Sequence, residues 1–210
     1  MINIAVFTCA KYSVLIPKWL TFFERTFPLP YHLDYIVAGT NTIQVPKSYN
    51  ADATHFMSCK DNGFAANMLD YMRDKTEPVM MMMDDHILFE ADKQLLIFAQ
   101  YMINEWKDVG CMRLVPWPGP TLQLSDSFGE IDKALEYAIS LQASFWRPQT
   151  LIDLIDPKWN PWQIELEGSK RAAIYDKRFI GCKTCAVNYK DYFMRGNPRP
   201  EHAEWVDSHL

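Results

Sequence analysis

Two carboxylates and an imidazole stand together at Asp84, Asp85 and His86, directly after the apolar run from 79 to 83. Such a run is typical of a central strand buried on both faces of an α/β sheet, and ligands of these sheets collect beyond the carboxyl ends of the strands. Adjacent carboxylates repel each other unless a cation neutralises them. Oxygen ligands with one nitrogen suit Mn²⁺ or Mg²⁺ better than structural zinc. We therefore expect a divalent cation here; the alternative is a surface acidic pair that caps the next turn.

A second pair of carboxylates, Glu165 and Glu167, follows Asn160-Pro161, a helix cap with proline at the first helical position. Side chains two residues apart on a helix point about 200° apart, so only one of the two can face a given cleft. That residue is a candidate general base for an acceptor hydroxyl. The alternative is that the helix macrodipole alone favours a carboxylate near this end.

Two histidines of the tail, His202 and His209, could complete a metal site if the tail folds over it, or could be exposed without a role. Trp117, Trp146 and Trp162 could stack on a sugar or a base, although tryptophan is also ordinary core material.

Several common motifs are missing from the sequence. There is no GxGxxG after the first apolar run, no GxxxxGK[ST] and no Gly-x-Ser-x-Gly elbow. Cys182-Lys-Thr-Cys185 is a lone CxxC, which is weak evidence for zinc and is more simply two semi-buried thiols on a strand.

The charge argues against binding to a nucleic-acid polymer, because the formal net charge is -5. It is uneven: from Lys170 to Arg199 eight basic residues stand against two acidic ones. A basic segment beside an acidic cluster suits a small phosphorylated anion carried with a cation; the alternative is a solvated basic face.

An odd number of cysteines, five, and no signal peptide predict a reducing, cytoplasmic location. The longest apolar run is far below the ~20 residues that a membrane span needs, so we expect no span.

Strands and helices are expected to alternate in the first half of the chain. The pattern predicts strands at 2–7, 33–37, 55–58, 79–86 and 109–115, with helices at 14–27, 64–73 and after Asp92. The segment 46–50 is expected to be loop. In the second half we expect strands at 137–145 and near 174, 179–180 and 186–187, helices at 148–155 and 162–173, and a loop from 195 onward. This order predicts one α/β domain with a central, mostly parallel sheet flanked by helices, Rossmann-like in its N-terminal half and mixed in its C-terminal half.

The chain resembles GT-A fold glycosyltransferases, especially small bacterial and phage-type members. Asp84-Asp85-His86 is similar to the DxD-type motif of that family, with histidine in the third place. Softer similarities are the first loop, Thr8 to Tyr12, and Asp61-Asn62-Gly63 with Asn67. Ser140-Leu141-Gln142 with Trp146, and the segment from Asn160 to Glu165, resemble the acceptor-side half.

The resemblance implies a role for each matching residue. A nucleotide-diphosphate sugar, with UDP favoured, would be bound by Thr8, Ala10, Lys11, Tyr12, Asn62, Gly63, Asn67, Asp84 and Asp85. The metal, Mn²⁺ or Mg²⁺, would be held by Asp85, His86 and His202, and Glu165 would be the catalytic base. Residues 1–115 would form the nucleotide-sugar-binding half, and 116–210 the acceptor-side half and tail of one domain.

Three hypotheses remain open from the sequence. The leading one is a metal-dependent glycosyltransferase acting on an unknown acceptor hydroxyl, with Lys11 or basic residues of 170–199 assisting. The second is a nucleotidyltransferase acting on a sugar phosphate, although the loop after the first strand lacks the glycines usual in such enzymes. The third is a non-catalytic nucleotide-binding protein on the same scaffold.

Overall fold

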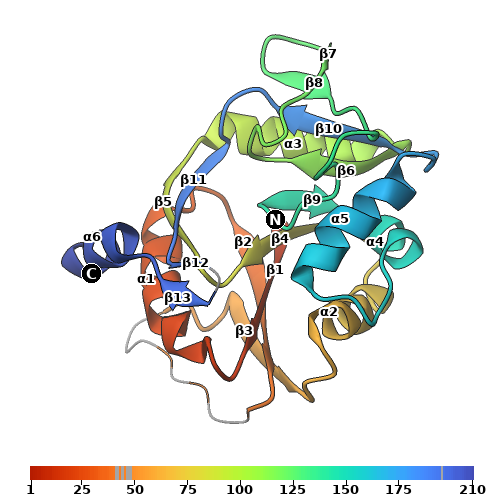
Figure 1. The fold of residues 1–210 in the computed structure, drawn as a ribbon. Helices are drawn as coiled ribbons and strands as arrows, with labels where there is room; N and C mark the ends of the chain where they lie inside the picture. Colours follow the sequence, from red (N-terminus) through yellow and green to blue (C-terminus); the bar gives the residue numbers. More distant parts are fainter. Residues whose placement is uncertain (41–42, 44, 46–48, 195) are drawn as a thin grey trace.

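A computed structural model describes residues 1–40, 43, 45, 49–194 and 196–210 (Figure 1). Its strands are β1 (Ile2–Cys9), β2 (Tyr31–Ala38), β3 (Thr54–Cys59), β4 (Val79–Met83), β5 (His86–Ala91), β6 (Val109–Arg113), β7 (Leu122–Gln123), β8 (Phe128–Glu130), β9 (Ser144–Trp146), β10 (Arg178–Cys182), β11 (Val187–Asp191), β12 (Phe193–Met194) and β13 (Asn197–Pro198). Its helices are η1 (Ser13–Leu15), a 3-10 turn, and α1 (Ile16–Thr26), α2 (Phe64–Arg73), α3 (Lys93–Glu105), α4 (Pro148–Leu154), α5 (Pro161–Ala172) and α6 (Pro200–Ser208).

The main sheet has the strand order β3-β2-β1-β4-β9-β6-β10-β8-β7. Strands β3, β2, β1 and β4 pair in parallel, and β10 is parallel to β6. Strand β9 is antiparallel to both β4 and β6, so these two run in the same direction. Six strands therefore end at one edge, and the expectation of a central, mostly parallel sheet is confirmed.

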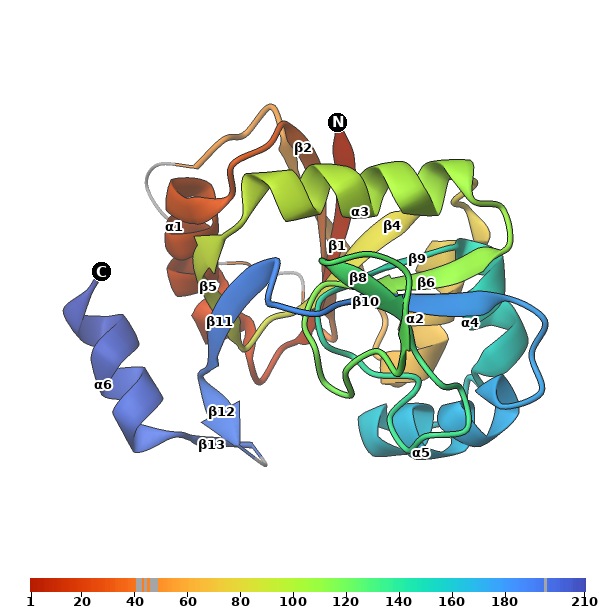
Figure 2. The same cartoon turned by 90° about the horizontal axis from the view of Figure 1, so that it is seen from above.

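Helices cover both faces of the sheet (Figure 2). One core layer joins α1 and α3 to the sheet through Trp19, Phe23 and Ile103, while the opposite layer joins α2, α4 and α5 through Met68, Leu151 and other side chains. The expected buried strand is β4, in which Val79 to Met82 are at most 2% exposed. Strands covered on both faces carry apolar side chains in succession, as the sequence of β4 does.

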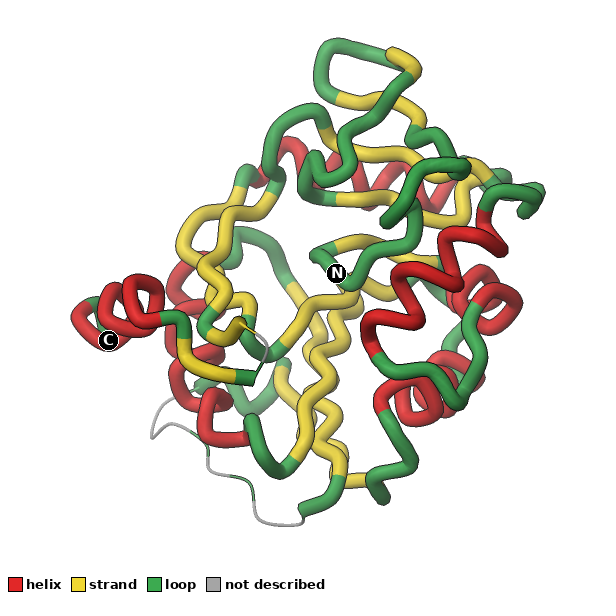
Figure 3. Tube along the Cα trace, viewed as in Figure 1, coloured by secondary structure: helices red, strands yellow, loops and turns green. Residues whose placement is uncertain are grey.

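The segment from 137 to 143 differs from the strand that its alternation predicts. Only Ser144–Trp146 joins the sheet, and most of the chain between β6 and β9 is loop (Figure 3). Its amides bond to α5 instead: Ile139 N donates to Ser169 Oγ at 2.9 Å, and Leu141 N donates to Glu165 Oε1 at 2.9 Å. Helix side chains thus supply the acceptors that a neighbouring strand would have given.

The tail also differs, because residues 200–208 form α6 where a loop was expected. Pro200 stands in the first turn of α6, where its missing N–H is not needed, so this proline starts the helix and does not break it. Trp205 packs against Phe22 of α1 with ring centroids 5.6 Å apart. The predicted loop at 46–50 lies partly outside the described residues.

None of the described helices has the length and apolarity needed to cross a bilayer. Cys9, Cys59, Cys111, Cys182 and Cys185 are all free thiols.

A buried carboxylate ties α2, which lines the cavity described below, to β2. Asp34 accepts hydrogen bonds from Tyr71 Oη at 2.7 Å and Lys75 Nζ at 2.9 Å. Burial is the largest single influence and raises the pKa of Asp34. The hydrogen bonds from Tyr71 and Lys75, with the positive charge of Lys75, outweigh it and hold this pKa below its ordinary value of 3.8.

Acid is therefore expected to loosen this attachment. Since the folded-state pKa of Asp34 is depressed, its contribution to stability is present above pH 3.8 and is lost as the pH falls through the folded-state value. Asp34→Asn should lower the free energy of unfolding at pH 7 and flatten its decline between pH 5 and pH 3. Urea unfolding over that range measures both effects. An unchanged acid slope in Asp34→Asn would show that other carboxylates control it.

Candidate active site

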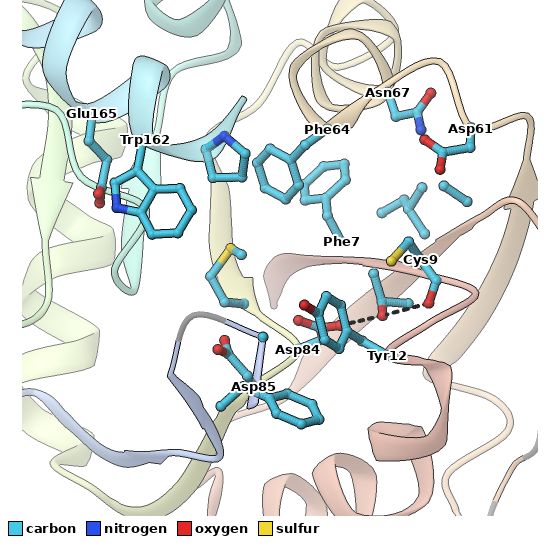
Figure 4. A pocket seen from close by; sticks show the side chains of 17 residues that line it. Phe7, Cys9, Tyr12, Asp61, Phe64, Asn67, Asp84, Asp85, Trp162 and Glu165 are labelled. Atoms are coloured by element: carbon cyan, nitrogen blue, oxygen red, sulfur yellow. Dashed lines mark hydrogen bonds between the residues drawn. The ribbon is translucent and has the colours of Figure 1, made fainter. Parts of the chain in front are cut away.

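A cavity of about 440 Å³ lies at the edge where the parallel strands end. Its size falls within the usual range for small-molecule sites. In Figure 4, Glu165 and Trp162 stand on one side, with Asp84, Asp85, Tyr12 and Cys9 on the other. The wall is formed by Phe7, Thr8, Cys9, Tyr12, Ile36, Ala38, Asp61, Phe64, Asn67, Met83, Asp84, Asp85, Pro161, Trp162, Glu165, Phe193 and Gly196.

The two adjacent acids occupy different positions in this wall. The last residue of β4 is fixed by Trp19, whose Nε1 donates to the Met83 carbonyl at 3.1 Å. Asp84 then turns inward, is 5% exposed, and accepts a hydrogen bond from the Thr8 hydroxyl. Asp85 lines the cavity, and its carbonyl accepts from Tyr192 N at 2.8 Å. Both acids thus line the cavity, Asp84 as a buried residue and Asp85 as a partly exposed one.

Both carboxyl groups hold their protons more tightly than in water. Burial, assisted by the charge of Asp85, raises the pKa of Asp84 to about 7. Burial also raises the pKa of Asp85 to about 6. Each pKa is raised because burial disfavours the ionised carboxylate, and a cation bound nearby would stabilise that ionised form.

The two histidines predicted as metal ligands, His86 and His202, have different partners. His86 Nε2 is 3.9 Å from Asp85 Oδ1 and 3.6 Å from Asp191 Oδ1, and its ring stacks on Tyr189. His202 Nδ1 is 3.0 Å from the Asp191 carbonyl. Burial lowers the pKa of His86 to about 4, so its imidazole is neutral at pH 7, and its buried Nδ1 has no partner among the described residues.

Asp85, His86 and His202 do not form a preassembled metal cage. Within the described ranges, no three His, Cys, Asp or Glu side chains converge in a metal-binding arrangement. Mg²⁺ and similar hard cations are nevertheless often held by one or two carboxylates with the remaining ligands supplied by substrate phosphates. The carboxylate of Asp85, half-buried beside the neutral imidazole of His86, fits that kind of site.

Glu165 is held in place by the irregular segment that precedes β9. Asn160 caps α5, accepting from Gln163 N at 2.9 Å in a full capping box, and so fixes the start of this helix. Glu165 Oε1 accepts from Ser140 Oγ at 3.1 Å and Leu141 N at 2.9 Å. Both bonds use the same oxygen, which leaves Oε2 for a ligand. Glu167, in contrast, has a side chain that is 44% exposed and pairs with Lys170 at 2.7 Å.

The remaining wall of the cavity is largely apolar and partly closed by the tail. Phe7 and Phe64 lie with their ring centroids 6.0 Å apart. Phe193 of β12 packs on Tyr12 at 4.9 Å. Gly196 turns the β12–β13 hairpin with φ of +79°, and a Cβ there would lie only 3.0 Å from Tyr12 Oη. Glycine therefore meets both demands of this approach, the left-handed backbone and the close contact.

A second cavity of about 480 Å³ shares Met83, Asp85 and Glu165 with the first. Its other wall residues are His86, Val115, Trp117, Leu141, Gln142, Cys185, Val187, Asn188, Tyr189 and Asp191. Glu165 and Asp85 therefore stand where the two cavities meet.

The structure brings some of the predicted site residues to these cavities and leaves others outside. Thr8, Tyr12, Asn67, Asp84, Asp85 and Glu165 line the first cavity, and His86 lines the second. Ala10, Lys11, Asn62 and Gly63 line neither, and His202 reaches the site only through Asp191. None of the described basic residues of 170–199 lines either cavity, and Arg195 lies outside the described residues.

Sequence reasoning missed several wall residues. Phe7 and Phe64 read as core positions of a strand and a helix, and only the fold turns their rings to a cavity. Asp191 belongs to no recognised sequence motif. Of the three tryptophans considered for stacking, Trp146 is 1% exposed and belongs to the core, while Trp117 and Trp162 are 70% and 59% exposed.

Arg113, which is fully buried, holds the loop that carries Trp117. Its guanidinium donates to the carbonyls of Trp117 at 3.1 Å, Tyr137 at 3.0 Å and Ala138 at 2.6 Å. Arg113→Met would leave these carbonyls unpaired, and we expect it to lower the free energy of unfolding by about 3 kcal/mol. Urea unfolding measures this. Arg73→Met, which removes an exposed arginine, should cost only about 0.5 kcal/mol; an equal cost for both variants would contradict the assignment.

No protein-family model matches the sequence, and no curated protein matches it. Among solved structures, S. aureus TarS (residues 1–349) is similar with a TM-score of 0.56 and 12% identity, over 98% of this chain and 63% of TarS. TarS has also been solved with UDP-GlcNAc and with UDP. The mannosyltransferase PcManGT from Pyrobaculum calidifontis, in complex with GDP-Man and Mn²⁺, gives a TM-score of 0.52 and 12% identity, over 97% of this chain and 59% of PcManGT.

A UDP-glucose pyrophosphorylase complexed with UDP-glucose is also similar, with a TM-score of 0.51 and 11% identity, over 100% of this chain and 98% of that one. The chain thus spans about 60% of the TarS and PcManGT structures and nearly all of the pyrophosphorylase. These likenesses confirm the GT-A-like fold class.

Proposed function

We propose that the protein is a glycosyltransferase that moves a sugar from a nucleotide-diphosphate sugar, with UDP favoured, to an acceptor hydroxyl. One observation carries the proposal: two cavities meet at Glu165 and Asp85. A donor in the first cavity and an acceptor in the second would bring their reacting atoms to this junction. TarS and PcManGT, which share the fold, were solved with UDP-GlcNAc and GDP-Man, and this supports the donor class.

The chemistry follows from this arrangement as a single displacement. The acceptor oxygen forms a bond to the anomeric carbon, and the bond from that carbon to the diphosphate breaks. The diphosphate leaves with the electron pair, and the acceptor proton passes to Glu165. Attack from the side opposite the leaving group inverts the anomeric configuration.

The donor would lie across the first cavity. We place the base against the aromatic wall at Phe7 and Phe64, with Tyr12 and Asn67 beside it, and the diphosphate near Asp85. A divalent cation, Mn²⁺ or Mg²⁺, would be held by Asp85, with His86 and His202 as the further predicted ligands. Such a cation offsets charge that develops on a leaving diphosphate.

A direct test is to incubate the protein with a panel of UDP- and GDP-sugars with Mn²⁺ or Mg²⁺ and to measure release of nucleoside diphosphate. We expect slow donor hydrolysis with one nucleotide, abolished by EDTA. Nucleotide binding by calorimetry without turnover of any donor would instead support a non-catalytic binding protein.

Nucleotidyl transfer is the second candidate, favoured by the nearly complete coverage of the pyrophosphorylase. The wall of the first cavity has no Lys or Arg among its described residues, whereas a nucleoside triphosphate brings more negative charge than a diphosphate sugar does. Release of pyrophosphate from a nucleoside triphosphate with a sugar 1-phosphate would establish this reaction and overturn our proposal.

A further inference from the structure

The second cavity differs chemically from the first. Its wall contains the carboxylates Asp85, Glu165 and Asp191, and no Lys or Arg among the described residues. Two of the described arginines contact wall residues without lining the cavity: the fully buried Arg113 donates to the Trp117 carbonyl at 3.1 Å, and Arg199 Nη1 lies 3.7 Å from Asp191 Oδ2. A phosphorylated or carboxylated ligand would meet like charges here without a cationic side chain to bind it.

The polar groups that this wall offers are mainly hydrogen-bond acceptors. Gln142 Oε1 is buried and has no partner among the described residues. Glu165 uses only Oε1 in its two hydrogen bonds. Of the two side-chain amides in the wall, Asn188 donates through Nδ2 to Glu90 Oε2 at 2.8 Å, and Gln142 adds Nε2 as a donor beside its Oε1. A complementary ligand must therefore bring donors, as a polyhydroxyl compound does.

The cavity also has flat and apolar surfaces. The side chain of Trp117 is 70% exposed, although its loop is held from below by Arg113. Val115, Leu141, Val187 and Tyr189 add apolar area. A solvent-facing indole on a loop whose backbone is anchored by Arg113, beside acidic hydrogen-bond acceptors, suits a ring that has a C–H face and a rim of hydroxyls.

From these observations we infer that the second cavity binds an uncharged saccharide as the acceptor, with Trp117 as its stacking platform, and that it excludes phosphorylated acceptors. The inference rests on the proposed function, since it names the acceptor class of that reaction. Sugar hydroxyls donate to Gln142 Oε1 and to the carboxylates, and the hydroxyl that points to Glu165 is the one that is glycosylated.

The test uses the donor identified by the release assay and two matched acceptor sets: methyl glycosides of glucose, galactose, mannose and N-acetylglucosamine, and the phosphate esters of the parent sugars at the primary hydroxyl. Products are followed by mass spectrometry. We expect transfer to at least one methyl glycoside, with kcat/KM at least tenfold above that of the corresponding sugar phosphate. Preference for a sugar phosphate overturns the inference.

Substitutions of Trp117 and Gln142, each with a matched control, test whether the acceptor binds in the second cavity. Trp117→Ala should raise the acceptor KM about tenfold and leave the donor KM unchanged, with Trp117→Phe restoring most of the affinity. Trp162→Ala, which removes another exposed indole, this one in the wall of the first cavity, should raise the donor KM and not the acceptor KM. Gln142→Lys should improve the use of sugar phosphates relative to methyl glycosides about tenfold, whereas Gln142→Met, similar in length but uncharged, should not.

The outcomes separate this inference from the proposed function. If the donor is hydrolysed but no saccharide of either set is glycosylated, or if Trp117→Ala leaves the acceptor KM unchanged while its thermal melt is normal, the acceptor inference fails and the glycosyltransferase proposal stands. If no nucleotide sugar is bound or hydrolysed, the proposed function fails, and the acceptor inference with it.

Discussion

Glu165→Gln is expected to lower kcat for sugar transfer by about 100- to 10,000-fold, the usual contribution of a general base. The amide keeps an oxygen that can accept from Ser140 Oγ and Leu141 N, so the position of the side chain should be preserved. What is lost is the group that takes the proton. Nucleoside diphosphate release in the presence of acceptor measures kcat, and calorimetry with the diphosphate should show unchanged affinity.

The matched control is Glu167→Gln, two residues along the same helix. Glu167 lines neither cavity and is paired with Lys170, so its loss should change kcat less than twofold. Full activity in Glu165→Gln, with product of retained anomeric configuration, would remove Glu165 from the chemistry and rule out the single displacement.

Asp85→Asn should abolish the part of nucleotide binding that depends on a divalent cation. A ligand present at a hundred times its Kd stabilises the folded chain by about 2.7 kcal/mol, which shifts the melting temperature by several degrees. In the parent protein, the melting temperature with UDP and Mn²⁺ should therefore be several degrees higher than the melting temperature with UDP and EDTA. In Asp85→Asn the two conditions should give the same shift.

Asp61→Asn provides the control, since Asp61 lines the same cavity and lies near Asn67, away from Asp85 (Figure 4). It should keep the increment that Mn²⁺ adds. An undiminished increment in Asp85→Asn would mean that the cation, if it binds, is held by other residues.

The sequence was informative where a short segment determines its own structure. The apolar run before Asp84 becomes the buried strand β4, Asp92 caps α3, and Asn160 and Pro161 begin α5. Each of these depends on neighbouring residues alone. The order of the elements was then sufficient to predict a central, mostly parallel sheet, and the first cavity lies at the edge where its parallel strands end.

Prediction failed where a distant segment supplied the partner. The alternation at 137–143 indicates a strand, yet α5 takes up its amides. A role for Lys11 at the nucleotide stays a prediction; its side chain lies over the ring of Tyr12, a wall residue of the first cavity, 5.0 Å from the centroid. Asp191 carries no local signal, because it reaches the site through the pairing of β11 with β5. A motif search has no access to such contacts.

The place of β9 has a consequence for how the protein forms. Residues 144–146 bridge β4 and β6, so both of these strands keep an unsatisfied edge until the later part of the chain arrives. A fragment ending after β6 would lack β10 as well as β9, so it would leave one edge of β4 and both edges of β6 unpaired, the usual template for intermolecular pairing. During synthesis the facing edges of β4 and β6 therefore stay unpaired until β9 has been made. We expect fragments that end before β9 to aggregate.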